Sequence, residues 1–194
     1  MELETKVLSQ QIQEALYNNN KTLGTAESCT GGGIAEAIVA VPGASQYFKG
    51  GIVSYTNEIK EKLLGVSHEV LEEQTAVCEE VAMEMVKGAC DALGVDYAIS
   101  ATGVAGPTGG TPEIPTGTIW LGYGSKDDVR TFCLTEDYGR GVNLNIAVKK
   151  ALNLFIEYLN EQEKQYKSLN TNILSRFALL FWRYFVILHS VWNK

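Results

Sequence analysis

The sequence of 194 residues predicts an α/β fold, a layered sandwich in which helices flank a mixed β-sheet, with an extra hydrophobic helix at the C-terminus. Between residues 4 and 159, β-prone runs alternate with helical patterns, which is typical of α/β layers. The runs at 118–124 and 129–134 predict a hairpin, so the sheet is mixed. The composition changes after Glu161. We therefore place one domain at residues 1–160 and a polar linker with a hydrophobic helix at residues 161–194.

Each element follows from its local pattern. In chain order the predicted elements are helix 4–17, strand 22–26, helix 34–39, strand 51–55, helix 58–64, helix 79–93, strand 97–101, strands 118–124 and 129–134, and helix 142–159. Helix 79–93 carries the clearest apolar stripe, and its N-cap falls on Cys78, a residue that caps poorly. Strand 97–101 is nearly all apolar, which predicts burial, and it leads into a loop rich in Gly, Pro and Thr over residues 102–117.

The bulk composition excludes several classes of function. A net charge of −7 argues against a nucleic-acid-binding protein, which needs a basic surface. The cysteines are scattered without metal-ligand spacing, so we expect free thiols in the cytoplasm. We expect no cofactor. Of the histidines, His68 falls in a predicted polar turn and His189 in the C-terminal segment. A catalytic site built on histidine is therefore poorly supported.

The C-terminal segment 173–192 is dominated by large apolar side chains. Its length would allow a membrane span, but Arg183 lies at its centre, where a charge costs about 2.5–3.5 kcal/mol on insertion. Three interpretations stay open. The segment docks on the body or on a partner subunit, which we rank first; it contacts a membrane surface; or it has no selected role. Separately, we expect a homo-oligomer.

The stretch AESCTGGG, residues 26–33, sets Ser28 and Cys29 before three glycines, where a predicted strand gives way to a helix. Backbone N–H groups at such a turn suit an anion or an oxyanion. A serine nucleophile, a cysteine nucleophile and a plain glycine turn all fit this local pattern. A serine needs a base, and Lys60, which follows Tyr55 at the end of strand 51–55, is the candidate. A solvated lysine on an exposed helix face is the alternative.

The loop over residues 102–117 is long for a compact domain, and such loops are usually functional. Its backbone donors and threonine hydroxyls could hold a phosphate. Ligands of α/β sheets bind at the carboxyl ends of strands, and strands 22–26, 51–55 and 97–101 each deliver one of the candidate segments there. Their convergence on one site is therefore plausible from topology.

These segments, taken together and in order, resemble the CinA C-terminal-domain family, the PncC-type nicotinamide-nucleotide amidases. The motifs that carry the resemblance are TAESCTGG at 25–32, GGIVSY at 50–55 with Asn57 and Lys60, Gly65-Val66, TAV at 75–77 with EEVA at 79–82, TGVAGP at 102–107 with Gly109-Gly110, and Pro115 with Gly117-Thr118. The resemblance extends over about residues 7–159.

The resemblance implies an amidohydrolase that converts nicotinamide mononucleotide to nicotinic acid mononucleotide and ammonia in pyridine-nucleotide recycling. The family's serine nucleophile falls on Ser28, and its tyrosine and lysine partners fall on Tyr55 and Lys60. No metal is implied. The positions expected to bind the nucleotide substrate are Thr30, Gly31, Gly32, Asn57, Thr102, Gly103, Gly106 and Arg140.

The sequence departs from the family pattern at cationic positions. Ile114 stands where the family has lysine, and Tyr138 and Asn143 stand where it has arginines; Arg140 is the nearby substitute. A lost cation weakens phosphate binding and removes a neighbour that could lower the pKa of the lysine. The alternative function is therefore a catalytically weak or silent nucleotide-binding or competence-associated scaffold protein.

Overall fold

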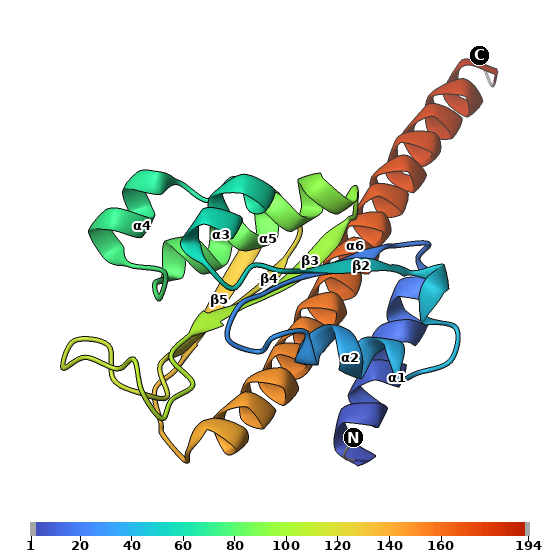
Figure 1. Cartoon of the computed structure of the whole chain (residues 1–194). Coiled ribbons are helices and arrows are strands. Elements are labelled where there is room, and N and C mark those ends of the chain that lie inside the picture. Colours follow the sequence, from blue (N-terminus) through green and yellow to red (C-terminus); the bar gives the residue numbers. More distant parts are fainter. Residues whose placement is uncertain (1–2, 193–194) are drawn as a thin grey trace. The chain divides into compact units, whose positions relative to one another are not determined.

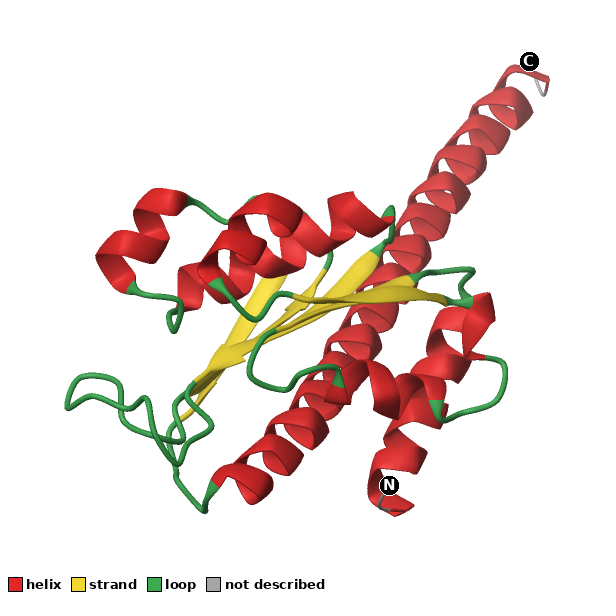
Figure 2. Ribbon diagram, viewed as in Figure 1, coloured by secondary structure: helices red, strands yellow, loops and turns green. Residues whose placement is uncertain are grey.

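The computed structural model describes the backbone of residues 3–192 and the side chains of residues 3–168. The chain divides into two compact units between Ile156 and Glu157. The first unit is a five-stranded sheet with helices on both faces, as Figure 1 and Figure 2 show. The second unit continues the last helix, in which Glu163 and Lys167 form an ion pair at i,i+4 spacing.

The sheet is mixed, as predicted. Its strands are β1 (Leu23–Glu27), β2 (Phe48–Val53), β3 (Tyr97–Gly103), β4 (Ile119–Gly124) and β5 (Val129–Leu134). They lie in the order β2-β1-β3-β4-β5. Strand β1 runs parallel to both β2 and β3, while β4 and β5 complete the sheet as antiparallel neighbours. Glu27 pairs with Val53 on one side and with Ala101 on the other, so β1 and β2 end level with each other, beside the last residues of β3.

Two helical layers bury the faces of this sheet (Figure 1). The helices are α1 (Leu3–Asn18), α2 (Gly33–Val39), α3 (Asn57–Leu64), α4 (His68–Gln74), α5 (Glu79–Leu93) and α6 (Arg140–Trp192), with a short 3₁₀ turn at Ala44–Gln46. On one face, the apolar stripe of α5 around Met85 and Ala89 packs on Ala26 and Ala98 of the sheet. On the other face, α1, α2 and the part of α6 up to Ile156 form the second layer, where the Phe155 ring meets Tyr97 edge to face at 5.8 Å.

Helix α3 is held in place by its caps and by close contact with α5. The Thr56 hydroxyl accepts a hydrogen bond from Ile59 N at the start of α3, and Gly65 ends it in a left-handed conformation with φ +64°. At the crossing with α5, a Cβ atom on Gly88 would lie 1.9 Å from the Leu64 carbonyl oxygen. Only glycine therefore allows the two helices to approach this closely.

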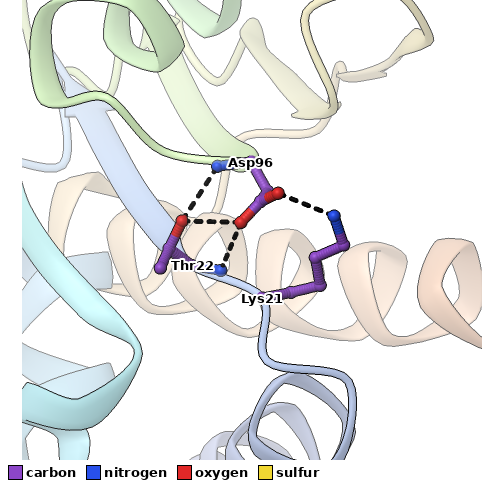
Figure 3. A network of polar contacts seen from close by, with 3 residues as sticks. All are labelled: Lys21, Thr22 and Asp96. Carbon is purple, nitrogen blue, oxygen red and sulfur yellow. Dashed lines mark hydrogen bonds and ion pairs between the residues drawn. The ribbon is translucent and has the colours of Figure 1, made fainter.

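A polar network fixes the amino ends of β1 and β3, at the opposite edge from the candidate site (Figure 3). The Asp96 carboxylate accepts hydrogen bonds from Lys21 Nζ at 2.7 Å, Thr22 N at 2.8 Å and Thr22 Oγ1 at 2.7 Å. The Lys21 ammonium and the Thr22 donors hold the pKa of Asp96 below its usual range, against the opposing effect of burial. The network pins the register of the two central strands.

The structure differs from the sequence prediction in a few local features. Helix α4 was not predicted: His68 is its first residue rather than part of a polar turn, and Ser67 caps it by accepting from Val70 N. Strand β3 continues to Gly103, two residues into the expected loop. The polar segment predicted as a linker is helical, because its Glu, Gln and Lys residues are good helix formers. The absence of a side-chain cap at Cys78 matches the prediction.

Within the described residues, no helix combines the length and the apolar character that a membrane span requires. The predicted docking or membrane contact of segment 173–192 depends on side chains that lie outside the described residues.

Candidate active site

The candidate site is centred on Ser28, the first residue after β1. Its backbone N–H donates to the Ala101 carbonyl at 2.8 Å, which continues the sheet ladder one residue beyond the strand. The side chain is buried, with 8% of its surface exposed. The sheet therefore fixes where the Ser28 hydroxyl lies.

Lys60 approaches Ser28 from the first turn of α3. Its Nζ atom lies 3.0 Å from Ser28 Oγ and donates to the Ser54 carbonyl at 2.9 Å. Ser54 is itself anchored, because its N–H donates to the Glu27 carbonyl at 2.8 Å. The lysine is only 1% exposed, and burial lowers its pKa. A lysine with a depressed pKa in contact with a serine hydroxyl is suited to act as its base.

Most hydrogen-bond donors of the glycine turn after Ser28 are already engaged within the protein. The buried Glu27 carboxylate accepts hydrogen bonds from Thr30 Oγ1 and from the N–H groups of Gly32, Ile34 and Ala35, at 2.7–3.1 Å. Gly31 N donates to the Ser28 carbonyl.

This geometry leaves no free N–H for substrate at Gly31 or Gly32, since Ser28 and Glu27 already accept from them, and the Thr30 hydroxyl is likewise engaged with Glu27. The Thr30 N–H has no backbone acceptor among the described residues. The sequence interpretation missed Glu27, although an acidic residue next to a predicted helix start is a known signal for such a contact.

A cavity of about 330 Å³ opens above Ser28. It joins the ends of β1 and β2 to the loop after β3, as the sequence predicted. The predicted site residues that line it are Ser28, Tyr55, Lys60, Asn57, Thr102, Gly103, Gly106 and Arg140. The structure thus brings together all predicted residues except those of the glycine turn.

Tyr55 lies at the rim of this cavity and not between serine and lysine. Its side chain is 60% exposed, and no hydrogen bond joins it to another residue in the described part of the chain. Lys60 contacts Ser28 directly. A role for Tyr55 as a proton relay between them therefore has no support in this geometry.

The first residues of α6 clamp the loop that forms the far wall of the cavity. Arg140 Nη1 donates to the Gly106 carbonyl at 2.9 Å, and Asn143 Nδ2 donates to the Ala105 carbonyl at 3.1 Å and to Asp137 Oδ1 at 2.8 Å. These contacts leave further guanidinium donors of Arg140, which lines the cavity. Arg140 thus supplies a cation here, while Asn143, at a position where the family has arginine, holds the loop.

The remaining sequence candidates lie apart from this chemistry. Thr102 lines the cavity, but its hydroxyl donates to the Ala76 carbonyl at 2.6 Å. The hydroxyl proton is therefore not available to a ligand. Burial raises the pKa of the neighbouring Cys29 thiol to about 12, which makes it a poor nucleophile. His68 is exposed and pairs with Glu61 at 3.0 Å, away from the residues that line the cavity.

An α/β sheet with a buried Ser–Lys pair at the carboxyl ends of its parallel strands is a scaffold suited to nucleophilic hydrolysis. Residues 5–159 match the CinA C-terminal domain family, and the chain belongs to that family.

Relatives that are similar in sequence carry two kinds of name. The chain is 50% identical over 124 residues to a CinA-like protein of Leptospira borgpetersenii, which covers 64% of this chain but only 30% of that protein. It is 45% identical over 120 residues to the nicotinamide-nucleotide amidohydrolase PncC of Escherichia coli K12, covering 62% of this chain and 73% of that protein. The chain therefore spans less than a third of the CinA-like relative and most of PncC.

Solved structures agree with the fold. A CinA superfamily protein from Klebsiella pneumoniae superposes with a TM-score of 0.78 at 32% identity, covering 81% of this chain and 98% of that one. A competence/damage-inducible protein from Agrobacterium tumefaciens gives 0.78 at 34% identity, with 82% and 99% coverage.

Proposed function

We propose that this protein is a nicotinamide-nucleotide amidase that hydrolyses nicotinamide mononucleotide to nicotinic acid mononucleotide and ammonia. The observation that carries the proposal is the 3.0 Å contact between Lys60 Nζ and Ser28 Oγ in a buried position at the base of a cavity. The similarity to PncC, a nicotinamide-nucleotide amidohydrolase by name, supports the substrate class.

The chemistry begins with neutral Lys60. Its amine takes the proton of Ser28 as Oγ attacks the carboxamide carbon, so a C–O bond forms and the carbonyl π electrons move to oxygen. The N–H groups of Cys29 and Thr30 have no backbone acceptor among the described residues, and we assign the oxyanion to them. The N–H that follows a nucleophile serves this purpose in other strand-to-helix turns.

Lys60 then acts as an acid. Its ammonium gives a proton to the amide nitrogen, the C–N bond breaks, and ammonia leaves an ester on Ser28. Lys60 next accepts a proton from a water molecule, which attacks the ester carbon and releases the carboxylic acid while Ser28 recovers its proton.

Substrate recognition falls to the opposite wall of the cavity. The Arg140 guanidinium is the cationic group that lines the cavity beside the loop, and it suits a phosphate oxygen of the nucleotide. Tyr55 and Asn57 line the exposed rim of the cavity, and we assign them to contacts with the ring or the ribose. We assign Tyr55 to substrate orientation.

Ammonia release from nicotinamide mononucleotide by the full chain tests the proposal. Ser28→Ala should abolish release and Lys60→Met should lower it by about 10²–10⁴-fold. His68→Ala is the control, because His68 is exposed, pairs with Glu61 and does not line the cavity, so the rate should stay unchanged. Full activity of Ser28→Ala would overturn the mechanism. Binding of the nucleotide without ammonia release by the unmodified protein would favour the silent nucleotide-binding alternative instead.

A further inference from the structure

Glu27 stands apart from the proposed chemistry, yet it is the most heavily engaged carboxylate next to Ser28. The side chain is 1% exposed. Oε2 accepts from Thr30 Oγ1 at 2.7 Å, Gly32 N at 3.1 Å and Ile34 N at 3.0 Å, and Oε1 accepts from Ala35 N at 2.8 Å. A buried anion satisfied by this many donors makes a rigid local structure.

Glu27 is also tied to both members of the reactive pair. Its side chain closes the turn that follows Ser28 through Thr30 and the first amides of α2. Its main-chain carbonyl accepts from Ser54 N at 2.8 Å, and the Ser54 carbonyl in turn receives Lys60 Nζ at 2.9 Å. Glu27 thus supports the turn that follows Ser28 and, through Ser54, the carbonyl that accepts the hydrogen bond from Lys60.

We propose that Glu27 is a positioning residue: its carboxylate holds the Ser28 turn so that Ser28 Oγ and the amides of Cys29 and Thr30 face the substrate together. This inference rests on the proposed amidase function, and it adds a second consequence. Because Glu27 fills the amide donors at the start of α2, a substrate phosphate is excluded there and is left to the Arg140 side of the cavity.

Replacing the Glu27 carboxylate by an amide should lower kcat while leaving KM nearly unchanged. In Glu27→Gln the new NH₂ group must face at least one N–H of the turn, a donor–donor clash that loosens it. A displacement of about 1 Å near a reacting atom can lower a rate by about 100-fold. We therefore expect kcat to fall by about 10- to 100-fold, while the KM for nicotinamide mononucleotide stays within about twofold, since Glu27 does not line the cavity.

Thr30 provides matched variants that keep the charge. Thr30→Val is nearly isosteric and removes one donor to Glu27, so kcat should fall by roughly tenfold in the same direction. Thr30→Ser restores the hydroxyl and should recover most of the wild-type kcat. Loss of packing alone would give the opposite order, because valine fills the space better than serine does.

The experiment measures kcat and KM for ammonia release by the full chain and its three variants, with the melting temperature of each. The proposal is overturned if Glu27→Gln keeps the wild-type kcat, if the loss is in KM alone, or if Thr30→Ser is no more active than Thr30→Val. Those last two variants decide the matter should Glu27→Gln fail to fold.

A second readout separates this inference from the proposed function. A fluorophosphonate probe labels an activated serine without any need for nucleotide recognition. If the wild-type chain releases no ammonia, the proposed substrate is wrong, and the rate of Ser28 labelling in the same variants then tests the positioning role. Equal labelling rates in Thr30→Val and wild type would overturn it.

Discussion

The crossing of α3 and α5 at Gly88 offers a sharp test, because it supports the helix that carries Lys60 and does not line the cavity. In Gly88→Ala, the new Cβ would lie 1.9 Å from the Leu64 carbonyl oxygen, and the atoms must separate by about 1.5 Å to reach an ordinary contact of 3.4 Å. The obstructing group is backbone, so the helix itself has to move. Helix α3 carries Lys60, so we expect the lysine to shift with it.

Opposing effects set the size of the stability change. Alanine gains about 1 kcal/mol over glycine in a helix interior. Overpacking costs about 1–3 kcal/mol, and a clash with backbone belongs at the upper end. We therefore expect a net loss of about 2 kcal/mol in unfolding free energy. For a chain of this size, that loss lowers Tm by about 6 °C.

The same shift should reduce activity. The Lys60–Ser28 contact is 3.0 Å, and a general base has to lie within about 3.2 Å of the group that it deprotonates. A shift of about 1 Å or more at Lys60 should lower kcat by up to about 100-fold. Calorimetric melting and the ammonia assay, both with the full chain, measure the two effects.

Gly141→Ala is the control, since it makes the same chemical change in α6 with no atom within 4 Å of the new Cβ. It should keep the wild-type kcat and leave Tm unchanged or slightly higher. Wild-type stability and activity in Gly88→Ala would refute the described packing of α3 on α5.

Further predictions concern the base, the sheet and the loop. Burial lowers the pKa of Lys60, so the unfolded chain binds that proton more tightly than the folded one and stability at this site rises with pH. Lys60→Met should therefore raise the unfolding free energy at pH 7. Urea titrations should show that this stability gain over the wild type shrinks as the pH rises towards 10.5. A stability gain that does not change with pH would contradict the burial argument. Ser100 Oγ donates to the Ala82 carbonyl at 2.7 Å, so Ser100→Ala should cost about 1 kcal/mol in urea unfolding without changing kcat. Asn143→Leu removes the hydrogen bond to the Ala105 carbonyl, and we expect KM to rise about fivefold, with less change in kcat. An unchanged KM would mean that the loop holds its shape without Asn143.

Most of the fold could be predicted from sequence because its signals are local. The stripe of α5 and the apolar run of β3 are strong periodic patterns, and both elements lie where they were expected. Helix α4 was missed because His68–Gln74 is short and polar, with Leu71 as its one buried side chain. Its start depends on the Ser67 cap, a weaker signal than periodicity.

The site could be predicted only in part. Topology predicted that the ends of β1, β2 and β3 would meet, and the resemblance assigned Ser28 and Lys60, whose contact the structure describes. The occupied state of the glycine turn could not be predicted from spacing, because it depends on the direction in which the Glu27 side chain points. The role of Asn143 was hidden for a similar reason, since its partners Ala105 and Asp137 become neighbours only in three dimensions.

The hydrogen bonds of the central sheet continue past the ends of β1 and β2, to Ser28 and Ser54, and this affects how the site can change during evolution. Ser28 N and Ser54 N are hydrogen-bonded into the central sheet, so amide exchange at these positions requires the sheet itself to open. The loop opposite is exposed from Thr108 to Glu113, and Arg140 and Asn143 of α6 hold it only through the preceding carbonyls of Gly106 and Ala105. If the proposed amidase function holds, mutations in that loop can alter which amide is accepted while the Ser28–Lys60 pair keeps its geometry. In this fold, the proposed reaction and the substrate preference can therefore evolve independently, because they depend on different parts of the chain.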